Sequence, residues 1–137
     1  MKKLFLSLVV VLTALASCAP SAMDVQPGTA AEAAQEFFTA IKDADYSKAS
    51  DWANLAEVPG ASISTEYAAK AALGLMKTLN SSLGMEEVYA VAETVNGEEA
   101  EVELYVKTKE NGRGSILATC KKVDDAWKCN IDFSVKE

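Results

Sequence analysis

The hydrophobic pattern of this chain changes its period once, near Gly84, and that change limits the fold more than any other feature. In residues 64–83 the apolar side chains recur every three or four positions, which is typical of an amphipathic helix. From Glu86 onwards apolar and polar residues alternate, which is typical of strands with one buried face. Helical segments followed by a run of strands predict an α+β domain with an antiparallel sheet.

Three helices are expected before the sheet. Thr29 and Glu32 have the spacing of a capping box, so the first helix should begin after Thr29 and end near Asp43. A second, shorter helix is expected within residues 43–55, with Pro59-Gly60 as its break. The third helix begins near Ser64 or Thr65, and Gly84 has the place of a C-terminal cap.

Four strands should follow as two hairpins. The segments 88–95 and 100–106 flank Asn96-Gly97, a strong signal for a tight turn. A two-residue turn at that position would place Val91 opposite Val102 and Tyr89 opposite Leu104. The second hairpin is expected from strands 114–123 and 126–133, with Asp124-Asp125 between them.

The second hairpin predicts a specific cysteine pair. A two-residue loop at Asp124-Asp125 sets Cys120 directly opposite Cys129, in a pair without hydrogen bonds whose Cα atoms are about 4.5 Å apart. The same register puts Ile116, Ala118 and Cys120 on one face with Trp127, Cys129, Ile131 and Phe133. We therefore expect a disulfide between Cys120 and Cys129. Two reduced, buried thiols are the alternative, and a zinc site is disfavoured because the chain has no histidine.

The N-terminus has the features of an export signal. Two lysines follow Met1, residues 4–16 carry no charge, and small residues lead to Cys18. The apolar run is too short to span a bilayer, which needs about 20 residues. "LASC", residues 15–18, resembles the lipobox of bacterial lipoproteins, in which the leader is removed before the cysteine and that cysteine is acylated.

The resemblance to a lipobox implies three parts: a signal peptide over residues 1–17, lipidated Cys18 with a flexible tether to residue 28, and one domain over residues 29–137. It also implies a membrane-anchored lipoprotein of the bacterial cell envelope. The inner-membrane retention residue Asp is absent after Cys18, which favours the outer membrane over the inner. Loss of residues 1–17 moves the net charge from −7 to −9, which argues against nucleic-acid binding.

Three stretches of the domain resemble the domain of unknown function 4878: "AAQEFFTAIKDADYSKASDW", "VNGEEAEVELYV" and "KKVDDAWKCN". The resemblance implies a cystatin-like, nuclear transport factor 2-like roll, with three N-terminal helices packed on a four-stranded antiparallel sheet. That superfamily contains isomerases, dehydratases and cyclases as well as many non-enzymatic binding domains, so the fold does not define an activity.

The sequence favours binding over catalysis. The lack of histidine removes the commonest general acid–base group, and no nucleotide-binding glycine motif, cofactor site or catalytic set is evident. We expect a non-catalytic module that binds a small apolar ligand or an envelope protein. The alternative is a small isomerase- or dehydratase-like enzyme with an Asp/Glu–Tyr pair in the cone between helices and sheet. Four side chains could line a pocket there or simply form the core: Phe37, Tyr67, Met76 and Trp127.

Overall fold

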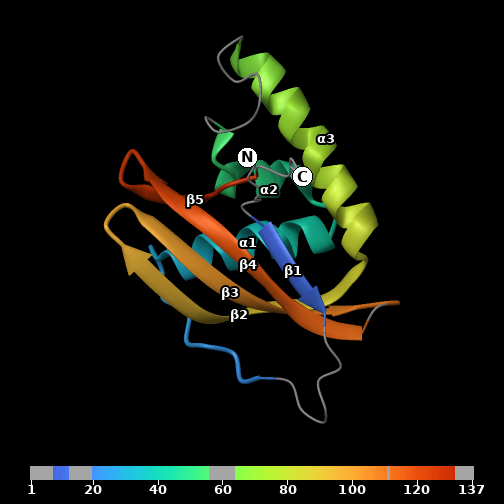
Figure 1. Cartoon of the computed structure of the whole chain (residues 1–137). Coiled ribbons are helices and arrows are strands. Elements are labelled where there is room, and N and C mark those ends of the chain that lie inside the picture. The colour runs from blue at the N-terminus through green and yellow to red at the C-terminus, as the bar shows by residue number, and fades with distance from the viewer. Residues whose placement is uncertain (1–7, 13–19, 56–63, 111, 132–137) are drawn as a thin grey trace, which may run out of the picture.

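Three helices lie over one face of a curved antiparallel sheet, so the predicted α+β architecture is confirmed (Figure 1). This is a computed structural model, which describes residues 8–12, 20–55, 64–110 and 112–131. Helix α1, Ala30–Lys42, lies against the sheet, whereas α3, Thr65–Leu83, packs on α1 and α2, Tyr46–Trp52. Helix α1 therefore lies between the sheet and α3, whereas α2 also contacts β5.

The helix ends follow the capping signals in the sequence. Thr29 caps α1 and accepts a hydrogen bond from the Glu32 amide at 3.2 Å, while the Glu32 carboxylate accepts one from the Gly28 amide at 2.8 Å. Ser64 caps α3 in the same way, through the amide of Tyr67. Gly84 ends α3 in the left-handed conformation, with φ of 54°, as its predicted role requires.

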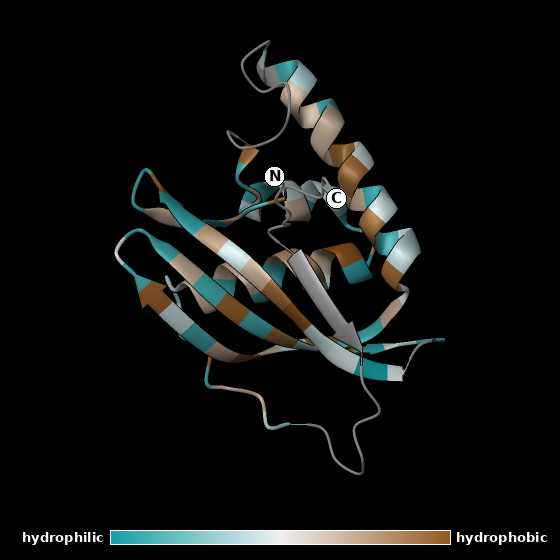
Figure 2. Ribbon diagram, viewed as in Figure 1, coloured by the Kyte–Doolittle hydropathy of each residue, from teal (hydrophilic) through white to brown (hydrophobic). Residues whose placement is uncertain are grey.

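The sheet contains the four predicted strands. They are β2, Met85–Asn96; β3, Glu99–Thr108; β4, Gly112–Val123; and β5, Ala126–Cys129. Strand β4 pairs with β3 on one side and with β5 on the other. Along β4 and most of β3 buried and accessible residues alternate, except that Tyr105 is buried as well, and the alternation of brown and teal in Figure 2 follows this pattern. One face is thus covered by α1 and the other is open.

The predicted register is correct for one of the two hairpins and wrong for the other. In the β4–β5 hairpin Asp124 and Asp125 both have positive φ, 53° and 66°, and Cys120 lies opposite Cys129, as expected. In the β2–β3 hairpin the expected register is wrong. The turn residues are Gly97 and Glu98, and Tyr89 pairs with Tyr105 rather than with Leu104. The turn is displaced by one residue, and a bulge between Ala90 and Ala92 shifts the pairing again.

The bulge in β2 connects the sheet to two other segments. The Ala90 amide donates to the Gln35 side chain of α1 at 2.8 Å, and the Ala90 carbonyl accepts from the Met23 amide at 2.9 Å. The Glu93 carboxylate accepts from the Ala31 amide in the first turn of α1 at 2.9 Å. The irregular stretch of β2 therefore fixes the start of α1 and holds the segment before it.

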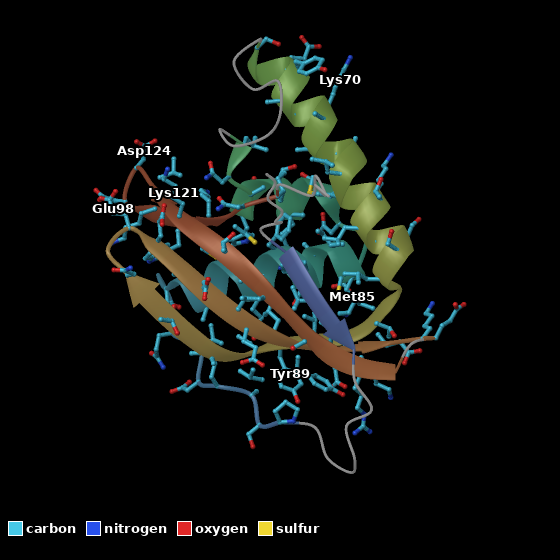
Figure 3. The ribbon with its side chains drawn as sticks, in the orientation of Figure 1. Lys70, Met85, Tyr89, Glu98, Lys121 and Asp124 are labelled. Atoms are coloured by element: carbon cyan, nitrogen blue, oxygen red, sulfur yellow. The ribbon has the colours of Figure 1, made fainter. Side chains whose placement is uncertain are left out.

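Residues 20–28, expected to be a flexible tether, lie against the domain in this structure. Met23 and Val25 pack on the hydrophobic core, and the Tyr89 hydroxyl donates to the Pro20 carbonyl at 2.5 Å. Tyr89 lies on the open face of the sheet, where Figure 3 labels it. Two apolar residues, Met23 and Val25, explain why this segment docks on the domain. So short an amphipathic pattern is not evident in the sequence.

A further strand, β1, Leu8–Leu12, belongs to the segment predicted to be the signal peptide. It pairs antiparallel with β4, from Leu8 opposite Ala118 to Leu12 opposite Gly114. Figure 1 shows β1 beside one half of β4 and β5 beside the other half. The described sheet thus has five strands, one more than expected.

Candidate functional site

The four residues expected to line a pocket do not share one. Phe37 and Met76 have no exposed surface and belong to the hydrophobic core, where α1 meets the sheet and α3. Tyr67 lies on α3 with 49% of its surface exposed. Trp127 on β5 is 9% exposed. Phe37 and Met76 are thus core residues and Tyr67 is a surface residue, and among the hollows lined by described residues Trp127 alone of the four borders one.

That hollow lies where the β4–β5 hairpin meets α2 and the start of α1. Its volume is about 530 Å³. A second hollow, described below, has a volume of about 410 Å³. Both tryptophans of the chain border the larger hollow: Trp127 from β5 and Trp52 from the last turn of α2. We call it the tryptophan hollow, and its full lining is Gly28, Thr29, Glu32, Lys48, Asp51, Trp52, Asp125, Ala126, Trp127 and Lys128.

Contacts between α2 and β5 set the distance between the two indoles. Ala53 forms an isolated bridge with Cys129, and the Asn54 amide donates to the Cys129 carbonyl at 2.8 Å. The Lys128 ammonium donates to the Asp51 carbonyl at 2.6 Å, at the end of α2. These bonds tie the residues beside Trp52 to the residues beside Trp127, so the hollow has a fixed frame.

The rim of the tryptophan hollow is charged with both signs. Lys48 forms an ion pair with Glu36, 3.1 Å from nitrogen to oxygen. Lys122 places its ammonium 5.6 Å from the centre of the Trp127 ring, a cation–π contact on the side of the hairpin. Glu32, Asp51 and Asp125 supply carboxylates. Such a site offers two aromatic surfaces with polar groups around them, which suits an apolar ligand with a polar end.

Sequence reasoning missed Trp52 as a site residue. It lies in α2, a helix of seven residues, and packs partly on the hydrophobic core. What brings it to Trp127 is the bridge between Ala53 and Cys129, a contact over 76 positions of the chain. The sequence has no local signal that would place the two tryptophans at one site.

The second hollow, of about 410 Å³, lies near the hairpin ends of β2, β3 and β4 and has both polar and apolar lining residues. Its lining residues come from β2, β3, β4 and the residue after β5: Thr94, Asn96, Glu99, Ala100, Glu101, Thr119, Cys120 and Asn130. Figure 3 shows Glu98, Lys121 and Asp124 at this same end of the sheet, near the two hairpin turns. Within the described parts of the chain, no cluster of three or more Cys, Asp or Glu side chains could hold a metal ion.

Cys120 and Cys129 are adjacent, buried and present as thiols, so the structure shows the predicted pair but not the disulfide. Burial, followed by the contact with Cys120, raises the pKa of the Cys129 thiol well above its usual value. A neutral thiol is a weak nucleophile, so Cys129 does not have the environment of a reactive site. Cys18 lies outside the described residues.

Comparisons with known proteins identify the fold alone. No family model matches the chain, and no curated protein matches it by sequence. Among solved structures, it is similar to a crystal structure from Campylobacter jejuni that is named as an NTF2-like transpeptidase. The match has a TM-score of 0.53 at 15% identity and covers 74% of this chain and 96% of the other. The likeness supports the NTF2-like part of the expected fold.

Proposed function

We propose that this chain is the precursor of a lipid-anchored lipoprotein of the bacterial cell envelope, and that its folded domain is a non-catalytic binding module for a small apolar ligand. The tryptophan hollow is the observation that carries the binding part. Its volume of about 530 Å³ lies in the range of about 300 to 1,000 Å³ that is usual for small-molecule sites. Trp52 and Trp127 supply the apolar surface, and Lys48 and Lys128 can orient a polar end.

The tyrosine contacts favour binding over the isomerase-like alternative. An Asp/Glu–Tyr pair needs a hydroxyl aimed at a carboxylate in an enclosed cavity. The Tyr46 hydroxyl instead accepts a bond from the Asn80 side chain at 2.8 Å, and the Tyr89 hydroxyl donates to the Pro20 carbonyl. The interior between α1 and the sheet is occupied by side chains such as Phe37 and Leu104, both without exposed surface.

Intrinsic fluorescence tests the binding site directly, because the only two tryptophans of the chain both border the hollow. Titration with 8-anilino-1-naphthalenesulfonate, an apolar aromatic probe with one negative charge, should quench tryptophan emission by energy transfer. Trp52→Ala should weaken binding of the probe at least about tenfold, which corresponds to about 1.4 kcal/mol. Tyr67→Ala, which removes an exposed aromatic ring from α3, is the matched control. Equal binding by the Trp52→Ala variant and the parent would contradict the site.

The anchor rests on "LASC", residues 15–18, and on the basic, apolar leader before it. One acyl chain gives only marginal membrane binding, whereas two or more anchor a protein stably. Residues 20–28 lie along the domain, so Cys18 would hold the open face of the sheet near Tyr89 close to the lipid. Membership of the domain of unknown function 4878 and a place in the outer membrane belong to the same proposal.

Expression of the Cys18→Ala variant in bacteria tests the anchor. Palmitate labelling should disappear, and the protein should move from the membrane to the soluble fraction. Ser81→Ala, an exposed change on α3 outside "LASC", is a control for altered expression. Membrane retention of the Cys18→Ala variant without label would show that another feature holds the protein.

A further inference from the structure

One edge of β4 is divided between two strands from opposite ends of the chain. β5 covers residues 120–123 of β4, and β1 covers residues 114–118. The two strands lie on the same side of β4, because β3 pairs with the other side along its whole length. Whatever follows β5 must therefore either meet β1 or leave the sheet.

The chain after β5 continues for one step along β4. The Asn130 amide donates to the Thr119 carbonyl at 2.9 Å, in register with Cys120 opposite Cys129, and Ile131 has no exposed surface. Continued in this register, residues 131–135 would lie opposite residues 118–114. β1 already occupies these positions, from Leu8 opposite Ala118 to Leu12 opposite Gly114. The two segments cannot pair there together.

The sequence of the C-terminal segment fits this edge. Ile131, Phe133 and Val135 alternate with Asp132 and Ser134, the pattern of a strand with one buried face. Trp127 and Cys129 are on the buried side of the hairpin. Ile131, Phe133 and Val135 alternate in step with these two residues, so in a continuous strand they would lie on the same face. Their partners in β4 would be Ala118 and Ile116, which are 2% and 0% exposed. The five residues 131–135 are long enough to reach the position opposite Gly114.

We propose that β1 and the C-terminal segment 131–135 are alternative occupants of this edge: β1 in the precursor, and residues 131–135 after the leader has been removed. The proposal rests on the signal peptide of the proposed function, since cleavage before Cys18 takes β1 away. Removal would leave the Ser115 and Leu117 amides of β4 unpaired, because edge-facing groups alternate with those that bond β3. Unpaired edges are costly and prone to association, and the C-terminal segment is next to this one.

Processing would thereby complete the sheet. In the proposed exchange the leader occupies the place of the last strand until it is removed. After cleavage, β5 extends from Ala126 to Val135 and joins the core beside α1. In this proposal the precursor is exported first, and the sheet is completed only after the leader has been removed.

A cleavable precursor tests the exchange in a single sample. A protease recognition site is inserted in the full chain between Leu12 and Pro20, outside both strands, and the melting temperature is measured before and after digestion and gel filtration. Phe133→Asp should lower the melting temperature by at least about 5 °C after cleavage but leave the uncleaved chain unchanged within about 1 °C. Ser134→Asp, on the open face, is the matched control and should have little effect in either form.

Nuclear magnetic resonance on the same samples identifies the occupant. Contacts between the Phe133 ring and the Ile116 methyl groups should appear only after cleavage, with the Ser115 and Leu117 amides protected from exchange before and after. Three results would overturn the proposal: unprotected amides after cleavage, a leader peptide that stays bound, or protection with dimer formation and no Phe133–Ile116 contact. Because the cut is made in vitro, the result does not depend on whether cells acylate Cys18, which the Cys18→Ala variant tests separately.

Discussion

Cys120 and Cys129 face each other across β4 and β5 in a pair without hydrogen bonds. The bond from the Asn130 amide to the Thr119 carbonyl makes the next pair along the ladder the bonded one, which fixes the type of the cysteine pair. Both side chains are buried, and Cys120 also contacts the Ala30 carbonyl at 3.7 Å, at the start of α1. A bond between them would fasten the last hairpin where it meets the first helix.

We predict that the exported protein carries the Cys120–Cys129 disulfide. Closing a loop of about ten residues contributes about 2.7 kcal/mol on the chain-entropy account. Intact mass without reduction should be two daltons below that of the dithiol. The Cys120→Ala/Cys129→Ala variant should match the reduced wild-type protein in stability more closely than the oxidised one. Two free thiols, titrated in denaturant without reductant, would contradict the prediction.

In reduced protein, the same pair should resist alkylation. Burial raises the pKa of the Cys129 thiol, so the reactive thiolate is scarce at pH 8 and iodoacetamide should label it only as the domain opens. Labelling should accelerate at least about a hundredfold in denaturant. Rapid labelling of both thiols in the native protein at pH 8 would show that the hairpin is open in solution.

Of the four residues first considered for a pocket, Phe37 lies in the core and Tyr67 lies on the surface, so changes at the two should differ in their effect on stability. Phe37 is fully buried on α1, where its ring meets that of Phe38 edge to face at 5.1 Å. Phe37→Ala should lower the free energy of unfolding by about 3 to 5 kcal/mol. Tyr67→Ala should change it by no more than about 0.5 kcal/mol. Chemical denaturation measures both, and a small effect of Phe37→Ala would mean that the interior holds more space than the packing indicates.

Glu93 gives a fourth prediction, of a smaller change in stability. Its carboxylate accepts a bond from the Ala31 amide and so acts as a cap for α1 from the sheet. Glu93→Ala should reduce stability by about 1 kcal/mol. Glu101→Ala, an exposed change on the neighbouring strand, is the control. Equal effects of the two changes in urea denaturation would mean that the capping bond contributes nothing measurable.

The helices could be predicted closely because their signals are local. Thr29, Ser64 and Gly84 act within one turn of the chain, and each has its predicted role in the structure. The β4–β5 register was predictable for a similar reason, since two positive-φ aspartates make the turn and two cysteines confirm the pairing on one face. The β2–β3 register was not, because the bulge at Ala90 depends on Gln35 and Met23, which lie far away in the sequence.

The candidate site was less predictable than the fold. Trp127 was identified from its strand, but its partner Trp52 is placed by the bridge from Ala53 to Cys129, for which the sequence has no local signal. Phe37 and Met76 have apolar spacing that fits a pocket wall and a packed core equally well. Only the volume left between α1 and the sheet distinguishes the two, and that volume depends on the whole core.

Tyr89 leads to a prediction about pH. Its hydroxyl donates to the Pro20 carbonyl, and its ring lies 4.9 Å from that of Tyr105. Partial burial, then the charges of Tyr105 and Glu87, raise the pKa of Tyr89 above its ordinary value of 10.0. Because the folded state holds this proton more tightly than the unfolded chain, the stabilisation is complete below about pH 10 and is lost as the pH rises through the folded-state pKa.

Tyr89→Phe removes both the bond and the titration. At pH 8 the variant should be less stable by about 0.5 to 1 kcal/mol, the net value of an ordinary hydrogen bond. Above pH 10 the wild-type protein should lose stability faster, so the two curves should converge towards pH 12 in urea denaturation. Amide exchange at Met23 should accelerate in the variant, since residues 20–28 lose one of their two bonds to β2, whereas exchange at Val102 in the core should not change. Parallel stability curves with unchanged exchange at Met23 would mean that the Tyr89 hydroxyl does not hold this segment to the sheet.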